Sequence, residues 1–295
     1  MSELIDIRTF VTAARLGSFA KAARRLDISP AMVGRRVQAL EEHYGARLIE
    51  RTTRSQRLTE LGERFLVQAQ AVLDAENALG DLTRVEPGQL HGRIRISAPT
   101  TLGIRRLPRI VAGFVAAHPG AICEISLSDR RVDLIAEGFD LAVRIGMLPP
   151  SSLIVRRIGT YRFICCAAAS HVERHGMPQT PDGLQHAPCV LNLNLIPRNR
   201  WPFIGPEGQE VTAAVRGGIE IDNGEAQLAA ALAGGGAAYL PEDLVRDDLA
   251  SGRLVRILPN WTMPGLPIQV VHPSRKQVPR RVTAFIDALA EGMRE

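Results

Sequence analysis

Arginine supplies most of the basic chemistry in the first 59 residues. This segment holds eleven basic and six acidic side chains, and Lys21 is its only lysine. The rest of the chain holds 25 of each sign, so the whole net charge of +5 lies in the first fifth. Guanidinium groups make planar, bidentate contacts to phosphate and guanine. An anionic partner is therefore expected here, with nucleic acid favoured over a membrane.

Two histidines have a spacing that can hold a metal. His171 and His175 lie four residues apart, but Val172 occupies the glutamate position of H-E-x-x-H. Cys189 is followed by Asn192 where a C-x-x-C pair would need a second cysteine. The histidines are therefore interpreted as part of a solvated helix face.

The other reactive residues do not form a catalytic pattern. Cys165 and Cys166 are adjacent on an expected strand, so they face opposite sides and are interpreted as buried apolar residues. Gly234 to Gly236 resembles a helix-to-strand turn, and no serine lies in a G-x-S-x-G context. The sequence predicts no enzyme activity, no metal site and no cofactor.

Helical periodicity and capping residues divide the basic segment into short elements. The expected elements are a helix from Leu4 to Gly17, a helix over 19–26, a turn at Asp27-Ile28, a helix over 30–44 and a two-stranded wing over 46–59 that turns near Arg54-Ser55. Ser18 and Ser29 are expected N-caps, Pro30 suits a first helical position, and Gly45 ends the third helix.

Two short helices joined by a tight turn make a helix-turn-helix. Its second helix, here the third of the segment, would lie in the major groove of duplex DNA. The outward residues of this helix are Ala31, Met32, Gly34, Arg35 and Arg36, and the wing offers Arg51, Thr52, Thr53, Arg54 and Arg57. A solvated basic face on a small helical domain is the alternative explanation of this charge.

A long amphipathic helix is expected over residues 60–86. Its apolar positions follow a heptad through Leu58, Leu61, Phe65, Gln68, Val72, Ala75, Leu79 and Leu82. This spacing is typical of a coiled-coil seam and favours a partner chain. Packing against the following domain of the same chain is the alternative. The residues Glu86-Pro87-Gly88 predict a linker.

From residue 91 the pattern changes to α/β. Strands are expected over 93–98, 122–128, 140–145, 153–168 (one bent or two), 237–240, 253–258 and 267–272, and helices over 103–117, 132–137, 224–234, 241–250 and 279–294. This alternation predicts parallel-rich sheets in two lobes, with the chain crossing near 160–164 and 263–267. Such a fold places a ligand in the cleft between the lobes.

Composition and the first residues indicate where in the cell the protein is expected. No apolar run approaches the roughly 20 residues that span a bilayer, and the first residues lack the layout of a signal peptide. Four cysteines in 295 residues are no disulfide framework. A cytoplasmic protein without membrane contact is therefore expected.

Several fragments together resemble one family. GSFAKAARRL, ISPAMVGRRVQALE and ARLIERTTRSQRLTELG are similar to the DNA-binding domain of LysR-type transcriptional regulators, over residues 3–66 without a gap. The resemblance continues in ISAPTTLG, LSDRRVDLIAEGFDLAVRIG and GGGAAYLPEDLV. It implies a multidomain protein: an all-α winged helix-turn-helix over 1–59, a linker and dimerisation helix over 60–87, and a two-lobed α/β domain related to periplasmic binding proteins over 88–295. Lobe I would comprise about 88–162 and 266–295, and lobe II about 163–265.

The resemblance also implies function. Such a regulator binds double-stranded promoter DNA as a dimer of dimers, responds to a small-molecule effector, and has RNA polymerase as a further partner. The family's DNA contacts correspond here to Ser29, Ala31, Arg35, Arg36, Arg51, Thr52 and Arg54. The family commonly has serine where this chain has Gly34, which removes a hydroxyl and lowers helix propensity by up to about 1 kcal/mol. A soluble small-molecule binding protein without a DNA-binding role is the alternative.

The effector contacts implied by the resemblance are Thr100, Thr101, Ser128, Asp129, Arg144, Pro197, Trp201, Asn223 and Gly224. Backbone N–H groups near Thr101 and Gly224 would favour an anion, and Arg144 could pair with a carboxylate. A small carboxylate or aromatic effector is therefore expected. The alternatives are ordinary helix capping by the threonines and a structural ion pair of Arg144 with Asp140 or Asp129.

Overall fold

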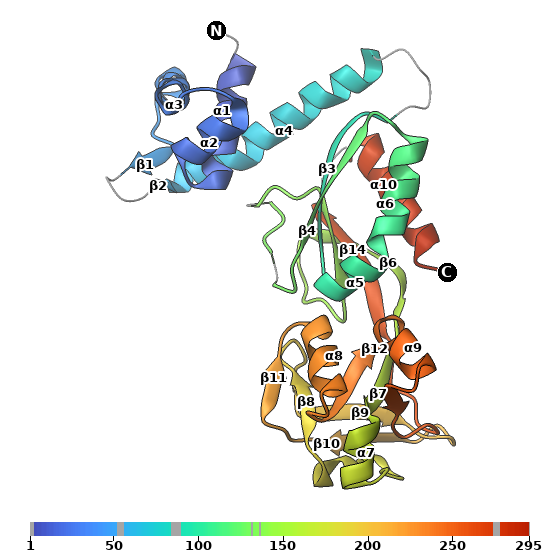
Figure 1. Ribbon diagram of the computed structural model, residues 1–295. Helices are drawn as coiled ribbons and strands as arrows, with labels where there is room; N and C mark the ends of the chain where they lie inside the picture. The colour runs from blue at the N-terminus through green and yellow to red at the C-terminus, as the bar shows by residue number, and fades with distance from the viewer. Residues whose placement is uncertain are drawn as a thin grey trace.

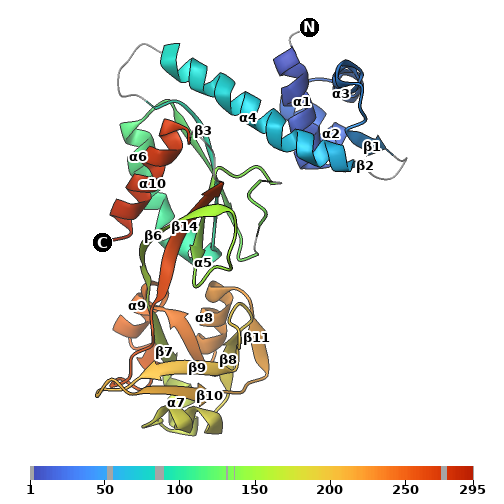
Figure 2. The ribbon, with the colours of Figure 1, turned by 180° about the vertical axis from the view of Figure 1, so that it is seen from behind.

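The computed structural model describes residues 3–51, 56–83, 90–130, 132–135, 137–273 and 278–294. Figure 1 shows a small N-terminal unit, a long helix that leads away from it, and two α/β lobes. One lobe lies next to the long helix, and the other lies on the opposite side of the first lobe. Both views place the C-terminus on the lobe nearer to the long helix (Figures 1 and 2). The chain therefore passes through the far lobe and returns to the near one.

The N-terminal unit contains three helices and a short hairpin. Its elements are α1 (Glu3–Leu16), α2 (Phe19–Leu26), α3 (Pro30–Tyr44), β1 (Ile49–Arg51) and β2 (Gln56–Leu58). Ser18 Oγ accepts from the Lys21 N–H and Ser29 Oγ accepts from the Met32 N–H, which confirms both predicted N-caps. Gly45 ends α3 in the left-handed conformation. The predicted wing turn near Arg54-Ser55 lies outside the described residues.

Helix α4 (Glu60–Thr83) packs one face on the N-terminal unit. Leu66, Ala69 and Leu73 on this face are buried in the same apolar cluster as Phe10. Phe65, expected in the heptad seam, instead contributes to this core: its ring lies edge-on to Phe10 and Tyr44, with centroids 5.4 Å and 4.9 Å apart. Phe65 therefore packs partly within the chain, and its place in an intermolecular seam stays a prediction.

Three other residues of the predicted seam are open to solvent, whereas Leu58 packs against the N-terminal core. Leu61, Val72 and Leu79 are 45%, 43% and 64% exposed. The alternative that this stripe packs on the following domain is therefore wrong for these three residues. Leu82 is the seam residue whose side chain lies outside the described part.

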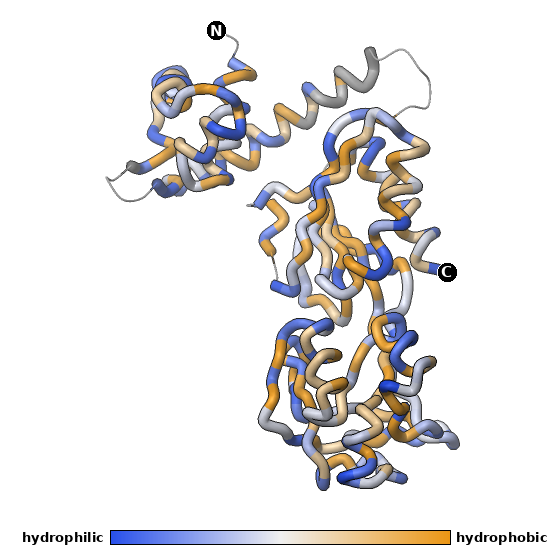
Figure 3. The backbone as a smooth tube through the Cα atoms, in the orientation of Figure 1, coloured by the Kyte–Doolittle hydropathy of each residue, from blue (hydrophilic) through white to orange (hydrophobic). Residues whose placement is uncertain are grey.

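Lobe I is built on a five-stranded sheet of order β4-β3-β5-β14-β6. Its elements are β3 (Gly92–Ala98), α5 (Thr100–Arg105), α6 (Leu107–Ala117), β4 (Ala121–Leu127), β5 (Leu141–Ile145), β6 (Leu153–Tyr161), β14 (Leu266–Pro273) and α10 (Arg280–Gly292). Helices α6 and α10 lie side by side along the sheet (Figures 1 and 2). The strands at the centre of this lobe are predominantly hydrophobic (Figure 3), in agreement with the complete burial of Ile94, Ile96 and Leu141.

Lobe II is built on a second five-stranded sheet, of order β11-β8-β12-β7-β13. Its elements are β7 (Phe163–Ala168), α7 (Ala169–His175), the 3-10 helix η1 (Pro181–His186), β8 (Cys189–Asn192), β9 (Arg200–Ile204), β10 (Glu210–Ala214), β11 (Ile219–Ile221), α8 (Gly224–Leu232), β12 (Ala237–Pro241), α9 (Glu242–Ala250) and β13 (Leu254–Arg256). Helices α8 and α9 cover the face that contains Cys166, and the β9–β10 hairpin covers the face that contains Cys165. The predicted opposite orientation of the two cysteines is confirmed.

Both sheets are mixed, so the expectation of parallel-rich sheets is only half right. Strand β3 runs parallel to β4 and β5, whereas β14 is antiparallel to β5 and β6. In lobe II, β8 runs parallel to β11 and β12, whereas β7 is antiparallel to β12 and β13. The antiparallel strands are β7, with which the chain enters lobe II, and β14, with which it returns to lobe I.

Two predicted helices differ in the structure. The helix expected over 103–117 is interrupted at Arg106, because Pro108 at the start of α6 cannot continue a helix from α5. The helix expected over 132–137 is a series of turns within its described residues, held by bonds such as Phe139 N–H to the Leu134 carbonyl.

The N-terminal unit touches lobe I through a carboxylate on β4. Glu124 accepts from Arg25 of α2 at 3.3 Å and also pairs with Arg93 and Arg95 of β3. Burial would raise the pKa of Glu124, but the two β3 arginines lower it below its ordinary value. Glu124 therefore stays ionised and joins the two units by charge.

Candidate functional site

The first half of α3 presents the predicted DNA-contact residues. Ser29, Ala31 and Arg35 are all exposed. The opposite side of the helix is fixed by Val33 and Val37, which are completely buried. A helix anchored in this way can present Arg35 to a major groove without rearrangement.

Arg36 differs from its neighbour, although the resemblance implies the same role for both. Its side chain is 20% exposed and turns toward α1. The Nη1 group donates to Thr9 Oγ1 at 3.4 Å, and Nε lies 4.0 Å from Asp6 Oδ1. Because Asp6 and Thr9 are themselves buried, Arg36 anchors α3 to α1 and is not directed to solvent.

The wing is described only at its base. Arg51 ends β1, but its side chain lies outside the described part, as do Thr52 and Arg54. Gln56 Oε1 of β2 accepts from the Phe19 N–H at 3.0 Å. This bond satisfies an amide at the start of α2 and fixes the wing to the helix-turn-helix.

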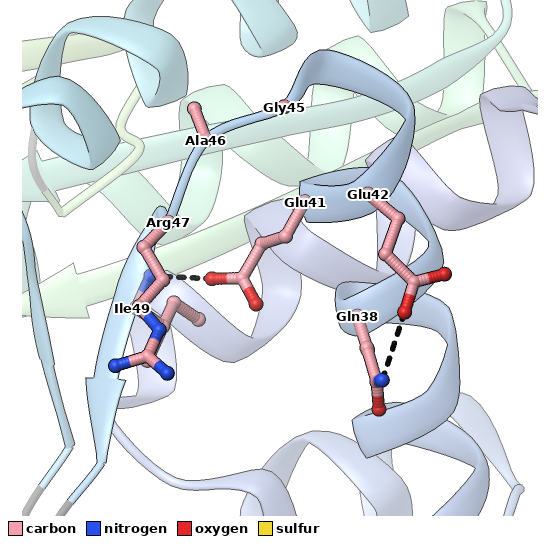
Figure 4. Close-up of a pocket in the computed structure, with 7 residues that line it drawn as sticks. All are labelled: Gln38, Glu41, Glu42, Gly45, Ala46, Arg47 and Ile49. Atoms are coloured by element: carbon pink, nitrogen blue, oxygen red, sulfur yellow. Dashed lines mark hydrogen bonds between the residues drawn. The ribbon is translucent and has the colours of Figure 1, made fainter.

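A shallow hollow of about 620 Å³ lies where α3 ends and the wing begins (Figure 4). Glu41 Oε1 accepts from the backbone N–H groups of Leu48 and Ile49 at 2.8 Å and 2.9 Å. Glu42 accepts from Gln38 at 2.9 Å. Since both carboxylates have internal partners, the hollow is explained by the attachment of the wing to α3.

A second cavity, of about 360 Å³, lies between the lobes. Lobe I contributes Thr100, Leu127, Ser128, Asp129 and Arg130, and lobe II contributes Asn194, Asp222 and Asn223. Four of these residues were among the predicted effector contacts: Thr100, Ser128, Asp129 and Asn223. They come from the loop after β4, the start of α5 and the start of α8, which face each other in Figure 1.

Two further predicted residues lie beside the cavity rather than on its lining. A Cβ added to Gly224 would lie 2.5 Å from Thr101 Oγ1. The two residues therefore pack closely across the lobes, and Thr101 is buried. Glycine at 224 permits this approach of α8 to α5.

Arg144, Pro197 and Trp201 do not line the cavity. Arg144 donates to the Val143 carbonyl at 2.8 Å and to Ser97 Oγ at 3.2 Å. Pro197 is exposed and follows a cis peptide bond. Trp201 is completely buried in the core of lobe II, and its Nε1–H donates to the Arg198 carbonyl. The predicted contact of Trp201 with an effector is wrong, because the indole fills this core.

Leu127, Arg130, Asn194 and Asp222 line the cavity but were not predicted. Asp222 directly precedes the predicted Asn223, and Leu127 and Arg130 flank the predicted Ser128-Asp129 pair, so sequence adjacency was an available signal. Asn194 follows β8, which has four residues and was not recognised as a strand. Its Nδ2 donates to the Asp222 carbonyl.

Consecutive arginines join the lobes behind the cavity. Arg105 makes two bonds of 3.2 Å to the carboxylate of Glu225 on α8. Arg106 lies 2.7 Å from Asp243 on α9, and its guanidinium stacks over the ring of Tyr161 at the end of β6. These ion pairs hold α5 against the starts of α8 and α9.

The predicted solvated helix face holds for His175, which is exposed, but not for His171. His171 is 2% exposed, and burial lowers the pKa of its imidazole. Its ring centroid lies 4.7 Å from that of His175. Within the described ranges, no three His, Cys, Asp or Glu side chains gather as a metal ion would require.

The same ranges contain no helix with the length and apolarity needed to cross a bilayer.

Two protein families match the chain. Residues 4–63 match the bacterial regulatory helix-turn-helix proteins of the lysR family, and residues 87–294 match the LysR substrate binding domain. An HTH-type transcriptional regulator of Haemophilus influenzae is 35% identical over 287 residues, covering 97% of this chain and 99% of the relative.

Solved structures of full-length regulators are also similar. The Vibrio cholerae virulence activator AphB is 28% identical with a TM-score of 0.63, and CrgA of Neisseria meningitidis is 27% identical with a TM-score of 0.62. Each comparison covers 99% of both chains. The helix-turn-helix, the two-lobed domain and these likenesses agree, and the chain belongs to the LysR family of transcriptional regulators, which bind DNA and respond to effectors.

Proposed function

We propose that this regulator binds promoter DNA as a dimer of dimers through α3 and the wing, and that a small molecule in the interlobe cavity alters this binding. The observation that carries the proposal is α3 itself. It is capped at both ends, buried along one side and exposed at Arg35. This is the arrangement that base readout in a major groove requires.

The proposal assigns separate roles to residues 1–59, 60–87 and 88–295: DNA contact, self-association and effector sensing. It places the protein in the cytoplasm, where it acts by binding and not by catalysis, with RNA polymerase as a further partner. The buried thiols of Cys165, Cys166 and Cys189 suit a reducing compartment. Burial also raises their pKa values, to about 12 for Cys166 and Cys189, so they are poor nucleophiles.

Duplex binding should depend steeply on salt. Each phosphate neutralised by arginine releases counterions, so affinity for an operator should fall at least about a hundredfold between roughly 50 and 200 mM salt. Fluorescence anisotropy with a labelled operator, selected from a random duplex pool, measures this slope. Folded protein that binds no duplex even at low salt would contradict the DNA-binding role.

Self-association should depend on the exposed seam of α4. A charge at Val72 would place an unpaired carboxylate in an apolar interface, so Val72→Asp should weaken dimerisation more than tenfold. Val67→Asp is the matched control, because Val67 is equally exposed on the same helix but lies outside the heptad. Sedimentation velocity should show smaller species for Val72→Asp alone. Identical profiles for both variants would remove α4 from the interface.

A further inference from the structure

We infer that the interlobe cavity selects an effector with a positively charged amine, not the carboxylate that the sequence suggested. The inference rests on the proposed role of this cavity as the effector site. It concerns the chemical class of the ligand and follows from the charges and the occupied hydrogen-bonding groups around the cavity.

The carboxylates of the lining outweigh its cations. Asp129 from lobe I and Asp222 from lobe II both line the cavity, and Arg130 is its single lining cation in the described residues. Asp222 is exposed, and its carboxylate makes no hydrogen bond or ion pair within the described part of the chain. A ligand held between the lobes therefore meets negative charge from each side.

The lining arginine already has a carboxylate partner. Arg130 Nη2 bonds both oxygens of Glu137, at 3.1 Å and 3.0 Å. An anionic ligand would have to compete with this pair. Arg144, the predicted partner of a carboxylate, bonds Ser97 Oγ away from the lining. Two further cations at the lobe junction, Arg105 and Arg106, are paired with Glu225 and Asp243.

One backbone amide at each of the two helix starts expected to attract an anion is also occupied. The Thr100 N–H at the start of α5 donates to Asp129 Oδ1 at 3.0 Å. The Ala226 N–H in the first turn of α8 donates to Asn223 Oδ1 at 3.0 Å. One amide at each helix start is therefore satisfied by an acceptor of the chain itself, which reduces the attraction of that start for an external carboxylate.

The volume and the remaining polar groups limit the ligand. A cavity of about 360 Å³ is at the small end of ligand pockets, so a short aliphatic amine fits it. Ser128 and Asn194 add a hydroxyl and an amide that can bind further polar groups. The expected class is a small diamine or amino alcohol with one ammonium near Asp222.

Calorimetry with two ligands of equal length tests this charge preference. Cadaverine and glutarate each carry two terminal charges on a five-carbon chain, with opposite signs. The full-length protein should bind cadaverine at least about tenfold more tightly than glutarate. Asp222→Asn should weaken cadaverine binding about fivefold or more. Glu207→Gln, the same charge change on an exposed loop residue outside the lining, should leave it unchanged.

Any of four results would overturn the inference. The first three are tighter binding of glutarate than of cadaverine, loss of glutarate affinity in Arg144→Gln, and failure of cadaverine to bind at millimolar concentration. Unchanged cadaverine affinity in Asp222→Asn would also overturn it. Calorimetry is done without DNA, and operator binding is measured separately on the same preparation. A failure of the charge preference can therefore be distinguished from a failure of the regulatory function.

Discussion

The Arg35→Ala variant is expected to bind its operator about tenfold to a hundredfold more weakly than the wild-type protein at fixed salt. Arg35 is exposed on the first half of a buried, capped helix, where helix-turn-helix proteins contact base edges. Base contacts distinguish sequences whereas phosphate contacts do not, so the loss on a random duplex should be smaller. Anisotropy titrations with both duplexes measure the difference.

Arg36→Ala is the matched control, because it removes the same side chain one position further along α3. This change leaves Asp6 buried without its cation, so the free energy of unfolding should fall by about 2 kcal/mol. Urea denaturation measures that loss, and the preference for operator over random duplex should persist. If Arg35→Ala weakened both duplexes equally, Arg35 would be a phosphate contact and not a base contact.

Gly62→Ala is expected to destabilise the N-terminal unit by about 3 kcal/mol. Gly62 lies in the first turn of α4, and a Cβ there would lie 2.0 Å from the Leu48 carbonyl oxygen. That oxygen already accepts from the Thr59 N–H, and Thr59 Oγ1 accepts from the Gly62 N–H. Neither backbone segment can yield without breaking these bonds. Hydrogen exchange over residues 3–51 should accelerate, and duplex affinity should fall with it.

Gly113→Ala makes the same change where there is space. Gly113 is exposed in α6, and nothing lies within 4 Å of an added Cβ. Because alanine is the better helix former, this variant should be up to about 1 kcal/mol more stable than wild type. Urea denaturation should therefore give opposite signs for the two variants. A neutral Gly62→Ala would show that α4 can separate from the wing at little cost.

Local signals in the sequence were sufficient for the helix-turn-helix. Ser18 and Ser29 satisfy amides a few residues away, and Gly45 ends α3 through its own backbone conformation. Such bonds depend on neighbours in sequence, so the bounds of α2 and α3 were predicted correctly. Pro108 carried an equally local signal for the break between α5 and α6, which the periodicity of the surrounding residues obscured.

Side-chain direction was harder to predict, because it depends on distant segments. Arg35 and Arg36 are adjacent arginines on one helix, yet Asp6 of α1 turns only the second one inward. From sequence alone, Trp201 could line a ligand site or fill a core. The strands packed around it bury it in the core of lobe II. Asn194 and Asp222 meet at the cavity only because β8 and β11 pair in parallel. Short strands of three to five residues give no periodicity long enough to detect.

The position of β14 also fixes an order of events during synthesis. This strand lies between β5 and β6 in the sheet of lobe I, although more than a hundred residues separate it from β5 in sequence. The sequence of lobe II lies between β6 and β14, so its strands leave the ribosome before lobe I has its fifth sheet strand. The sheet of lobe I can be completed only after residues 266–273 emerge, because β14 lies between β5 and β6 and hydrogen-bonds to both. The sensor therefore completes its first lobe last.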